Sequence, residues 1–151
     1  MSIMNNIWLK NGYDLTPKIY KVITTSLNSG FIEIVSNSIT MNAIYLKYGG
    51  GIIDGPRDET TLVKYFLNIH KNENTDKLIS CQNRFIRSLI GNIIWTWILG
   101  IGDRHSDNIM LNKYGCIFHI DFGRFLGNFE IKKVGSLVWE RERTKFVFLS
   151  S

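Results

Sequence analysis

The sequence predicts an α+β fold, in which helices make up most of the chain and a short β-hairpin carries the polar residues of interest. Two segments, 59–70 and 76–99, place apolar residues at helical spacing. Two apolar runs, 109–111 and 116–120, flank the turn sequence Asn-Lys-Tyr-Gly at 112–115, which is typical of a hairpin. Helices combined with an antiparallel hairpin define the α+β class.

The first helix expected from these patterns runs from 39 to about 48, with Ser38 as its N-cap and a triple glycine at 49–51 as its end. The glycines lack the lysine and the strand-to-helix context of a phosphate-binding loop, so we interpret them as a connector. The helix at 59–70 is expected to turn one apolar face to the core, made of Leu62, Val63, Phe66 and Leu67.

The segment 76–99 gives the strongest helix prediction, and Gly100 ends it directly before the loop at Asp103. We therefore expect this helix to hold that loop in place. Its apolar face is interpreted as core packing and not as a cofactor site; its members are Leu78, Phe85, Ile86, Leu89, Ile90, Ile93, Ile94 and Trp97.

The two ends of the hairpin carry an amide and a carboxylate. Asn108 precedes the first strand and Asp121 follows the second, and a hairpin brings its ends together. These oxygens would suit Mg²⁺, which takes few protein ligands and fills its other positions with water and phosphate oxygens. The sequence therefore predicts Asn108 and Asp121 as metal ligands.

The order Asp-Arg-His-x-x-Asn at 103–108, with His-Ile-Asp-Phe-Gly downstream at 119–123, resembles the phosphoinositide 3-kinase and 4-kinase family. A chance Asp-Phe-Gly would leave Asp103, His105 and Asn108 unexplained. The resemblance implies ATP and Mg²⁺ as cofactors. It also implies a protein-kinase-like fold, mostly the helical large lobe, with a small β remnant of the N-terminal lobe and a catalytic β-hairpin.

The resemblance covers nearly the whole chain and is closest to class I catalytic subunits. Residues 30–35 resemble the family's hinge strand, and 123–148 resemble its activation loop. It implies a small-lobe remnant with the hinge strand at 1–35 and a partial large lobe at 36–151. The phosphate-binding loop and ATP-binding lysine are expected upstream, and the later helices downstream. We therefore expect a fragment from hinge to activation loop, weakly active or inactive by itself.

Three residues depart from the family pattern. Arg124 follows Asp-Phe-Gly where class I usually has His, so a proton-transfer or phosphate-orienting role is not carried over to it. Lys145 stands where the family commonly has Pro, and Trp95 where it usually has a small residue.

The resemblance also implies roles for the site residues. His105 or Asp103 would accept the proton of the attacking hydroxyl, and the sequence leaves both open. Arg104 would brace the loop at 103–108, called the catalytic loop below, against a nearby carboxylate. For the nucleotide, the backbone of Glu33 and Val35 would bind adenine, with the inner pocket and floor made by Tyr20, Ile32, Met110 and Ile120.

Basic residues exceed acidic ones after the Asp-Phe-Gly turn, where this family meets its lipid headgroup. The candidate headgroup contacts form two clusters, Lys132 with Lys133 and Arg141 with Arg143. Two separated clusters suit a polyphosphorylated inositol, which favours phosphatidylinositol 4,5-bisphosphate as substrate.

Composition is ordinary for a globular protein, with 44% hydrophobic and 21% charged residues, and the net charge of +5 suggests anionic partners. Cys81 and Cys116 are expected to be reduced, and the N-terminus lacks a signal-peptide pattern. The expected location is therefore cytoplasmic and peripheral, at the cytosolic face of a membrane. The expected partners are a phosphoinositide lipid and possible regulatory subunits or further kinase regions, with no nucleic acid.

Four functions compete on this sequence. The first is phosphoryl transfer from ATP to the 3-hydroxyl of a phosphoinositide. The second is a non-catalytic or regulatory remnant that keeps a partial nucleotide and Mg²⁺ site. A protein kinase acting on Ser or Thr is disfavoured by the basic activation loop, and no motif supports a nucleic-acid binder.

Overall fold

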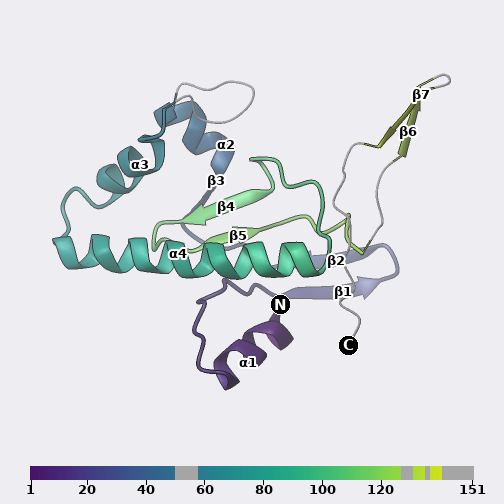
Figure 1. Ribbon diagram of the computed structural model, residues 1–151, viewed down its shortest axis with the longest axis horizontal. Coiled ribbons are helices and arrows are strands. Elements are labelled where there is room, and N and C mark those ends of the chain that lie inside the picture. The colour runs from purple at the N-terminus through teal and green to yellow at the C-terminus, as the bar shows by residue number, and fades with distance from the viewer. Residues whose placement is uncertain (50–57, 127–130, 135–136, 141–151) are drawn as a thin grey trace.

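The computed structural model describes residues 1–49, 58–126, 131–134 and 137–140 (Figure 1). The helices are α1 (Ser2–Lys10), α2 (Met41–Ile44), α3 (Thr61–Ile69) and α4 (Thr75–Ile98), with a π-helical segment at Tyr45–Gly49 after α2. The strands are β1 (Val22–Ser26), β2 (Ser29–Ile32), β3 (Ser38–Thr40), β4 (Ile109–Asn112), β5 (Ile117–His119), β6 (Ile131–Val134) and β7 (Leu137–Glu140).

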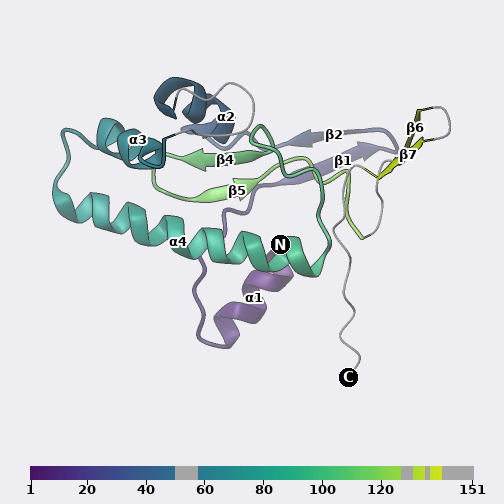
Figure 2. The ribbon, with the colours of Figure 1, turned by 45° about the horizontal axis from the view of Figure 1, so that its top comes forward.

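The hairpin predicted from the sequence is confirmed as β4 and β5, and β3 adds to the other edge of β4. In this antiparallel sheet Met110 pairs with Phe118, and Leu111 pairs with Ile117 on one side and with Ile39 on the other. Figure 2 shows α4 running along one face of the sheet and α2 lying on the opposite side. The hairpin is thus held between helices.

The predicted long helix is confirmed as α4, whose N-cap Asn74 accepts a hydrogen bond from the Lys77 N–H at 3.2 Å. α4 meets β5 through polar groups. Ser88 Oγ accepts from the Ile117 N–H at 3.0 Å, and Asn92 Nδ2 donates to the Ile117 carbonyl at 3.0 Å. These buried side chains satisfy main-chain groups that would otherwise lack partners in the interior.

The predicted core face of α4 is half confirmed and half wrong. Leu78, Phe85, Leu89 and Ile94 pack against the apolar clusters, whereas the other four predicted residues are exposed. Ile86, Ile93 and Trp97 are 54%, 58% and 56% exposed, because the face that packs inward is the one that carries small and polar residues. The buried positions are Cys81, Ser88, Gly91, Asn92 and Trp95, of which all but Trp95 are small or polar. Hydrophobic periodicity located the helix but did not identify the face that meets the sheet.

Two apolar clusters hold the described parts together. One joins α2, α3, α4 and the hairpin and contains Met41, Ile44, Tyr65, Phe66, Cys81, Leu111 and Ile117. The other joins α1 to the end of α4 and contains Trp8, Trp95 and Ile101. In the second cluster the Trp8 and Trp95 rings lie 6.0 Å apart, and a Cβ on Gly91 would come within 3.3 Å of Trp8.

Three local predictions differ from the structure. The helix expected from Ser38 begins after Thr40, whose Oγ1 accepts from the Ala43 N–H at 3.2 Å, because Ser38 pairs with β4 instead. The hinge strand ends at Ile32, three residues earlier than expected. On α3 the buried side chains include Thr61, Tyr65 and Phe66, whereas Val63 and Leu67 are exposed.

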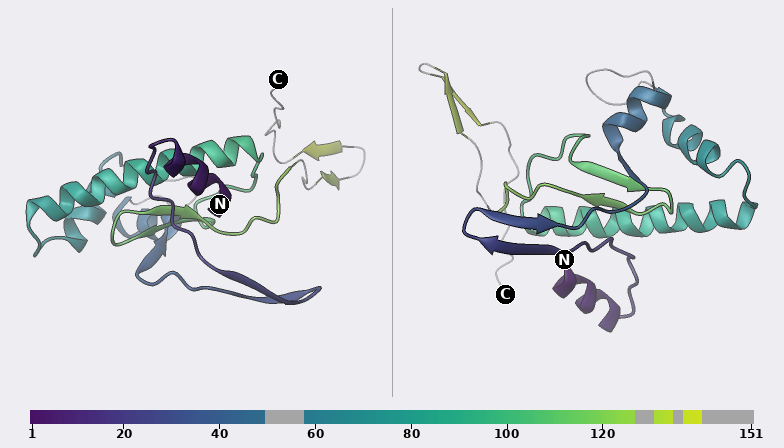
Figure 3. Two further views of the ribbon diagram at one scale, coloured as in Figure 1. Left: turned by 90° about the horizontal axis from the view of Figure 1, so that it is seen from below. Right: turned by 180° about the vertical axis from the view of Figure 1, so that it is seen from behind.

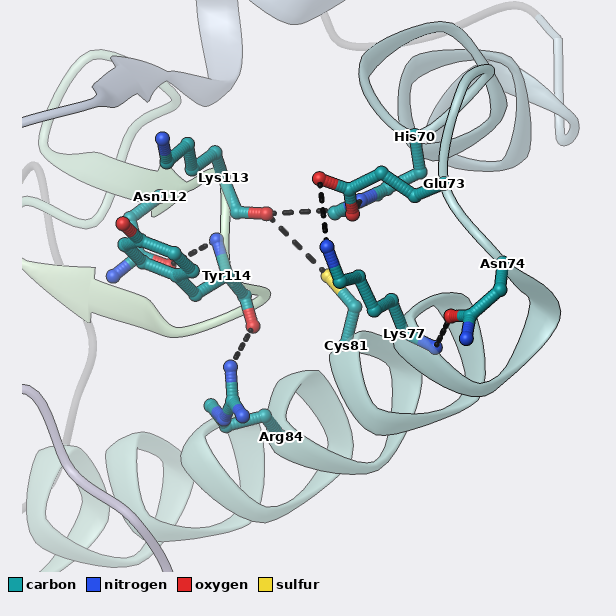
Figure 4. Close-up of polar contacts among 9 residues, drawn as sticks. All are labelled: His70, Glu73, Asn74, Lys77, Cys81, Arg84, Asn112, Lys113 and Tyr114. Carbon is teal, nitrogen blue, oxygen red and sulfur yellow. Dashed lines mark hydrogen bonds and ion pairs between the residues drawn. The ribbon is translucent and has the colours of Figure 1, made fainter.

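Side chains from α4 and the preceding loop anchor the hairpin turn (Figure 4). The Lys113 carbonyl lies 3.1 Å from His70 Nε2 and 3.6 Å from the Cys81 thiol, while Arg84 donates to the Tyr114 carbonyl at 2.9 Å. Gly115, in the same turn, has a φ of +92°. This end of the hairpin is therefore fixed against α4.

The hairpin β6–β7 stands apart from the helices and the other strands in both views of Figure 3. Its register pairs Lys132 with Trp139 and Lys133 with Val138. Among the described helices, none has the length and apolar character needed to cross a membrane.

Candidate active site

The open end of the hairpin brings Asn108 next to Asp121 along the backbone. Ile109 pairs with His119, and the Ile120 N–H donates to the Asn108 carbonyl at 3.0 Å, one residue before Asp121. Asp121 Oδ1 accepts from the Gly123 N–H at 3.2 Å, which closes a small turn around its carboxylate. The closeness expected from the hairpin is present in the backbone.

Both site aspartates adopt a left-handed backbone conformation, with φ of +59° at Asp103 and +57° at Asp121. Aspartate tolerates this region better than most residues because its short side chain can bond locally. Such a conformation persists only where neighbouring contacts hold it, and it re-aims the side chain relative to the strand.

Arg104 supplies much of that hold. It donates through Nε to the Gly102 carbonyl at 2.7 Å, through one terminal nitrogen to the Ile120 carbonyl at 2.7 Å, and through the other to the Asp121 carbonyl. The brace expected from the sequence is present, and these three bonds run to carbonyl oxygens. Arg104 ties the catalytic loop to the segment after β5.

Asp103 and His105, the two candidate proton acceptors, face each other. His105 Nε2 lies 3.9 Å from Asp103 Oδ1, while His105 Nδ1 accepts from the Asp107 N–H at 3.2 Å. The His105 side chain is 53% exposed and that of Asp103 is 28% exposed. The His105 imidazole is thus accessible from solvent.

The donor set fits Mg²⁺. Asn108 Nδ2 donates to the Asp103 carbonyl at 3.0 Å, so the amide oxygen points away from that carbonyl and can act as a ligand beside the exposed Asp121 carboxylate. In the described part of the chain, no three His, Cys, Asp or Glu side chains gather to hold a metal by themselves. Two oxygens with room for water and phosphates match magnesium rather than zinc.

All six residues predicted for the nucleotide line one cavity of about 260 Å³. It lies between the segment after β2 and the hairpin. The sequence analysis missed Ile34, Ser38 and Phe118, which also line it. Phe118 could have been identified from the sequence, because it is the cross-strand partner of Met110 and directly opposed residues of a hairpin project to the same face.

Tyr20 connects this cavity to the hairpin. Its hydroxyl donates to the His119 carbonyl at 3.1 Å, and its ring meets Phe118 edge-on at 6.2 Å. Burial raises the pKa of Tyr20. At the side of the cavity predicted for adenine, the Glu33 N–H donates to the Lys21 carbonyl at 2.8 Å, so this N–H is already used within the ribbon of β1 and β2.

His119 is buried below the site and contacts Thr96 Oγ1 through Nδ1 at 3.2 Å. Burial, with a smaller contribution from the Arg104 charge, lowers the pKa of His119 to about 4. A histidine that stays neutral at physiological pH suits the structural role that we expected for it.

A second, apolar cavity of about 270 Å³ adjoins the Asp-Phe-Gly turn and was not foreseen from the sequence. Tyr20 also lines it, with Trp95, Phe122 and Phe125 among the other lining residues. The Arg104 guanidinium lies 5.6 Å from the centre of the Phe122 ring, which keeps that ring beside the catalytic loop.

Of the four predicted headgroup residues, two lie in the described part of the chain. Lys132 and Lys133 fall in β6, and Arg141 and Arg143 lie outside the described residues. Their role stays a prediction.

Comparison with known proteins identifies the family of this chain. The family model described as phosphatidylinositol 3- and 4-kinase matches residues 1–135. The chain belongs to the phosphatidylinositol 3- and 4-kinase family. The family named from the two motifs is thereby confirmed, and membership in it implies a protein-kinase-like fold, with which the observed α+β architecture is compatible.

Curated relatives match nearly the whole chain. The C2 domain-containing subunit gamma of phosphatidylinositol 3-kinase from Rattus norvegicus is 39% identical over 99% of this chain and 9% of its own length. Phosphatidylinositol 3-kinase 2 from Dictyostelium discoideum is 41% identical over 98% of this chain and 8% of its own. The phosphatidylinositol 4-phosphate 3-kinase C2 domain-containing subunit alpha from Pongo abelii is 40% identical, with 99% and 8% covered. The chain thus spans about a tenth of the length of these relatives.

Proposed function

We propose that this chain carries the nucleotide-binding and catalytic segment of a phosphoinositide 3-kinase, which transfers the γ-phosphate of ATP to the 3-hydroxyl of a phosphatidylinositol headgroup. The observation that carries the proposal is the cavity lined by all six predicted nucleotide residues, bounded by the hairpin that also brings Asn108 next to Asp121. The relatives named as phosphatidylinositol 3-kinases support the same reaction.

In this proposal the adenine base lies on Met110 and Ile120 and meets the main chain of Glu33 and Val35. Asn108 and Asp121 would hold Mg²⁺, which supplies positive charge to the ATP phosphates. The chain's own residues then do two things. Asp103 and His105 receive or orient the hydroxyl proton, and Arg104 holds the loop that carries them.

Lobe assignment follows the same proposal. Residues 1–35 would contribute the small-lobe remnant and the hinge, and residues 36–151 would form part of the large lobe. The class I placement and the preference for phosphatidylinositol 4,5-bisphosphate, read by Lys132, Lys133, Arg141 and Arg143, also belong to it. A lipid substrate implies work at the cytosolic face of a membrane, where anionic lipids attract a chain of net charge +5.

Binding of Mg²⁺ and ATP to the full chain tests the site directly. We expect titration calorimetry to show ATP binding that requires Mg²⁺, and Asp121→Asn to remove most of that requirement. Asparagine tolerates the left-handed backbone of position 121, so the variant should fold. Asp76→Asn, in the first turn of α4, is the matched control and should bind as the parent does. Unchanged Mg²⁺-dependent binding in Asp121→Asn would sink the metal assignment.

Transfer is measured in a phosphatidylinositol 3-kinase whose matching segment is exchanged for this chain, because the chain by itself is expected to be weakly active or inactive. The exchanged kinase is the parent for every transfer measurement below. It is assayed with γ-labelled ATP on vesicles of fixed total charge that carry either phosphatidylinositol or its 4,5-bisphosphate. The proposal expects a 3-phosphorylated product, lost by at least about a hundredfold in Asp121→Asn because a direct metal ligand is removed. Mg²⁺-dependent nucleotide binding without any transfer would favour the alternative, a non-catalytic or regulatory remnant.

A further inference from the structure

The segment after Asp-Phe-Gly runs beside the start of the catalytic loop. The Gly102 N–H donates to the Arg124 carbonyl at 2.9 Å, and the Leu126 N–H donates to the Leu99 carbonyl at 2.9 Å. Main-chain contacts at its own carbonyl and two residues later therefore hold Arg124 beside the loop that carries Asp103.

The Arg124 side chain reaches that loop. Its Nε lies 3.7 Å from Asp103 Oδ2, whereas the other oxygen, Oδ1, lies 3.9 Å from His105 Nε2. The Arg124 and Asp103 side chains are only 21% and 28% exposed. Solvent and salt therefore screen this pair less than they screen an ion pair on the open surface.

The contact is reciprocal to the one made by Arg104. Arg104 leaves the catalytic loop and holds the carbonyls that follow β5, while Arg124 leaves the segment that follows β5 and contacts the catalytic-loop carboxylate. Asp103 has a left-handed backbone, a conformation that persists only where neighbouring contacts hold it, and Arg124 supplies one such contact to its side chain.

The chemistry of arginine limits what this residue can do. A guanidinium stays protonated at any pH at which the protein is folded, so Arg124 cannot accept the proton of an attacking hydroxyl. It can act directly on phosphate oxygens or through a neighbour, and Asp103 is a neighbour that it contacts at the site.

We propose that Arg124 is a positioning residue that holds the Asp103 carboxylate with one oxygen on the guanidinium and the other facing His105. This inference rests on the proposed function, because it assigns Arg124 to the proton-accepting side of that reaction. It predicts that the positive charge of Arg124, acting on Asp103, affects the rate of transfer more than the size of the Arg124 side chain does.

A double-substitution cycle measures whether Arg124 acts through Asp103. Arg124→Met should lower kcat for transfer by about ten- to a hundredfold, with the KM for Mg·ATP within about twofold. Arg124→Lys, which keeps the charge, should recover most of the loss. The pair Asp103→Asn with Arg124→Met should be no slower than Asp103→Asn alone, because groups that act as a unit are not additive.

A readout without turnover tests the pairing by itself. In the full chain labelled with ¹³C and ¹⁵N, Arg124→Met should shift the side-chain resonances of Asp103 and His105. Arg87→Met is the matched control: it removes an arginine whose ion pair with Asp14, at 3.6 Å, lies outside the site. In that control both resonances should stay in place.

The outcomes separate the two proposals. If the parent transfers no phosphate, the proposed function fails, and the resonance shifts still decide whether Arg124 orients Asp103. If the parent is active but the losses from Arg124→Met and Asp103→Asn multiply, Arg124 acts independently of Asp103 and the inference is overturned. It is also overturned if the Asp103 and His105 resonances do not respond, or if Arg124→Lys is as slow as Arg124→Met.

Discussion

The two ends of the β4–β5 hairpin are built in opposite ways. At the turn end, main-chain carbonyls of residues 113 and 114 are held by His70, Cys81 and Arg84, and Asn112 Oδ1 accepts from the N–H groups of Tyr114 and Cys116. At the open end, two left-handed aspartates present carboxylates, and arginines hold the loops around them. One end is fastened to α4, and the other carries the candidate chemistry.

The difference shows how a short hairpin can hold a reactive site. A two-stranded hairpin alone is marginally stable in water, so the polar end needs support from elsewhere. Buried groups supply it at the turn: burial raises the pKa of Cys81 to about 11, so its thiol keeps the proton that it donates to the Lys113 carbonyl. Strain at the open end is thereby offset by satisfied contacts at the other end.

Gly115→Ala should disrupt the anchored end of the hairpin. We expect it to lower the free energy of unfolding more than any other substitution proposed below. Position 115 has a φ of +92°, and a Cβ there would lie 2.1 Å from the Cys81 carbonyl oxygen. Backbone strain and overpacking together should lower the free energy of unfolding by about 3 kcal/mol or more. Urea denaturation of the full chain measures it.

Gly12→Ala is the matched control for that change. Its φ of +82° is also left-handed, but no atom lies within 4 Å of the added Cβ. The expected loss is only about 1 kcal/mol, from the backbone term alone. Equal losses in the two variants would show that the close approach to Cys81 is not what holds the turn.

The sequence predicted the parts of this comparison that depend on local pattern. The hairpin, the long helix and the nearness of Asn108 to residues 120–121 follow from turn residues and periodicity, and all are present. The six nucleotide residues, carried over from the family resemblance, line one cavity. Their roles in binding and catalysis stay predictions.

What the sequence did not predict depends on contacts between distant segments. The inward face of α4 is set by Ser88 and Asn92 bonding to Ile117, and polar residues give no hydrophobic signal. Ser38 was predicted as a helix N-cap, but in the structure it pairs with Asn112 of β4. The ion pair of Arg124 with Asp103 joins two loops whose geometry no spacing rule fixes.

His119, at the open end of the hairpin, should make stability depend on pH. The pKa of His119 is lowered to about 4 in the folded protein, against about 6.5 in the unfolded chain. The unfolded state therefore binds the proton first, so stability is complete above pH about 6.5 and falls as the pH drops toward 4, by roughly 2 kcal/mol. Urea midpoints at several pH values follow this change.

His119→Gln should remove that dependence. The amide can still bond to Thr96 but does not titrate in this range, so the unfolding midpoint should vary less between pH 7 and pH 4.5 than in the parent. A variant with the same pH profile as the parent would assign the acid sensitivity to other groups.

The smallest effects are expected from two substitutions on α4, Arg84→Met and Arg87→Met. Arg84→Met removes one hydrogen bond at the turn and none at the site. Its donor to the Tyr114 carbonyl is worth about 1 kcal/mol of unfolding free energy, which the variant should lose. Arg87→Met, one turn further along α4, removes a half-exposed ion pair and should cost less than about 0.5 kcal/mol. If the turn only anchors the hairpin, Mg·ATP binding should stay within about twofold of the parent in both variants. Weaker Mg·ATP binding in Arg84→Met alone would mean that the turn end also sets the position of Asn108 and Asp121. The two ends of the hairpin would then be structurally coupled.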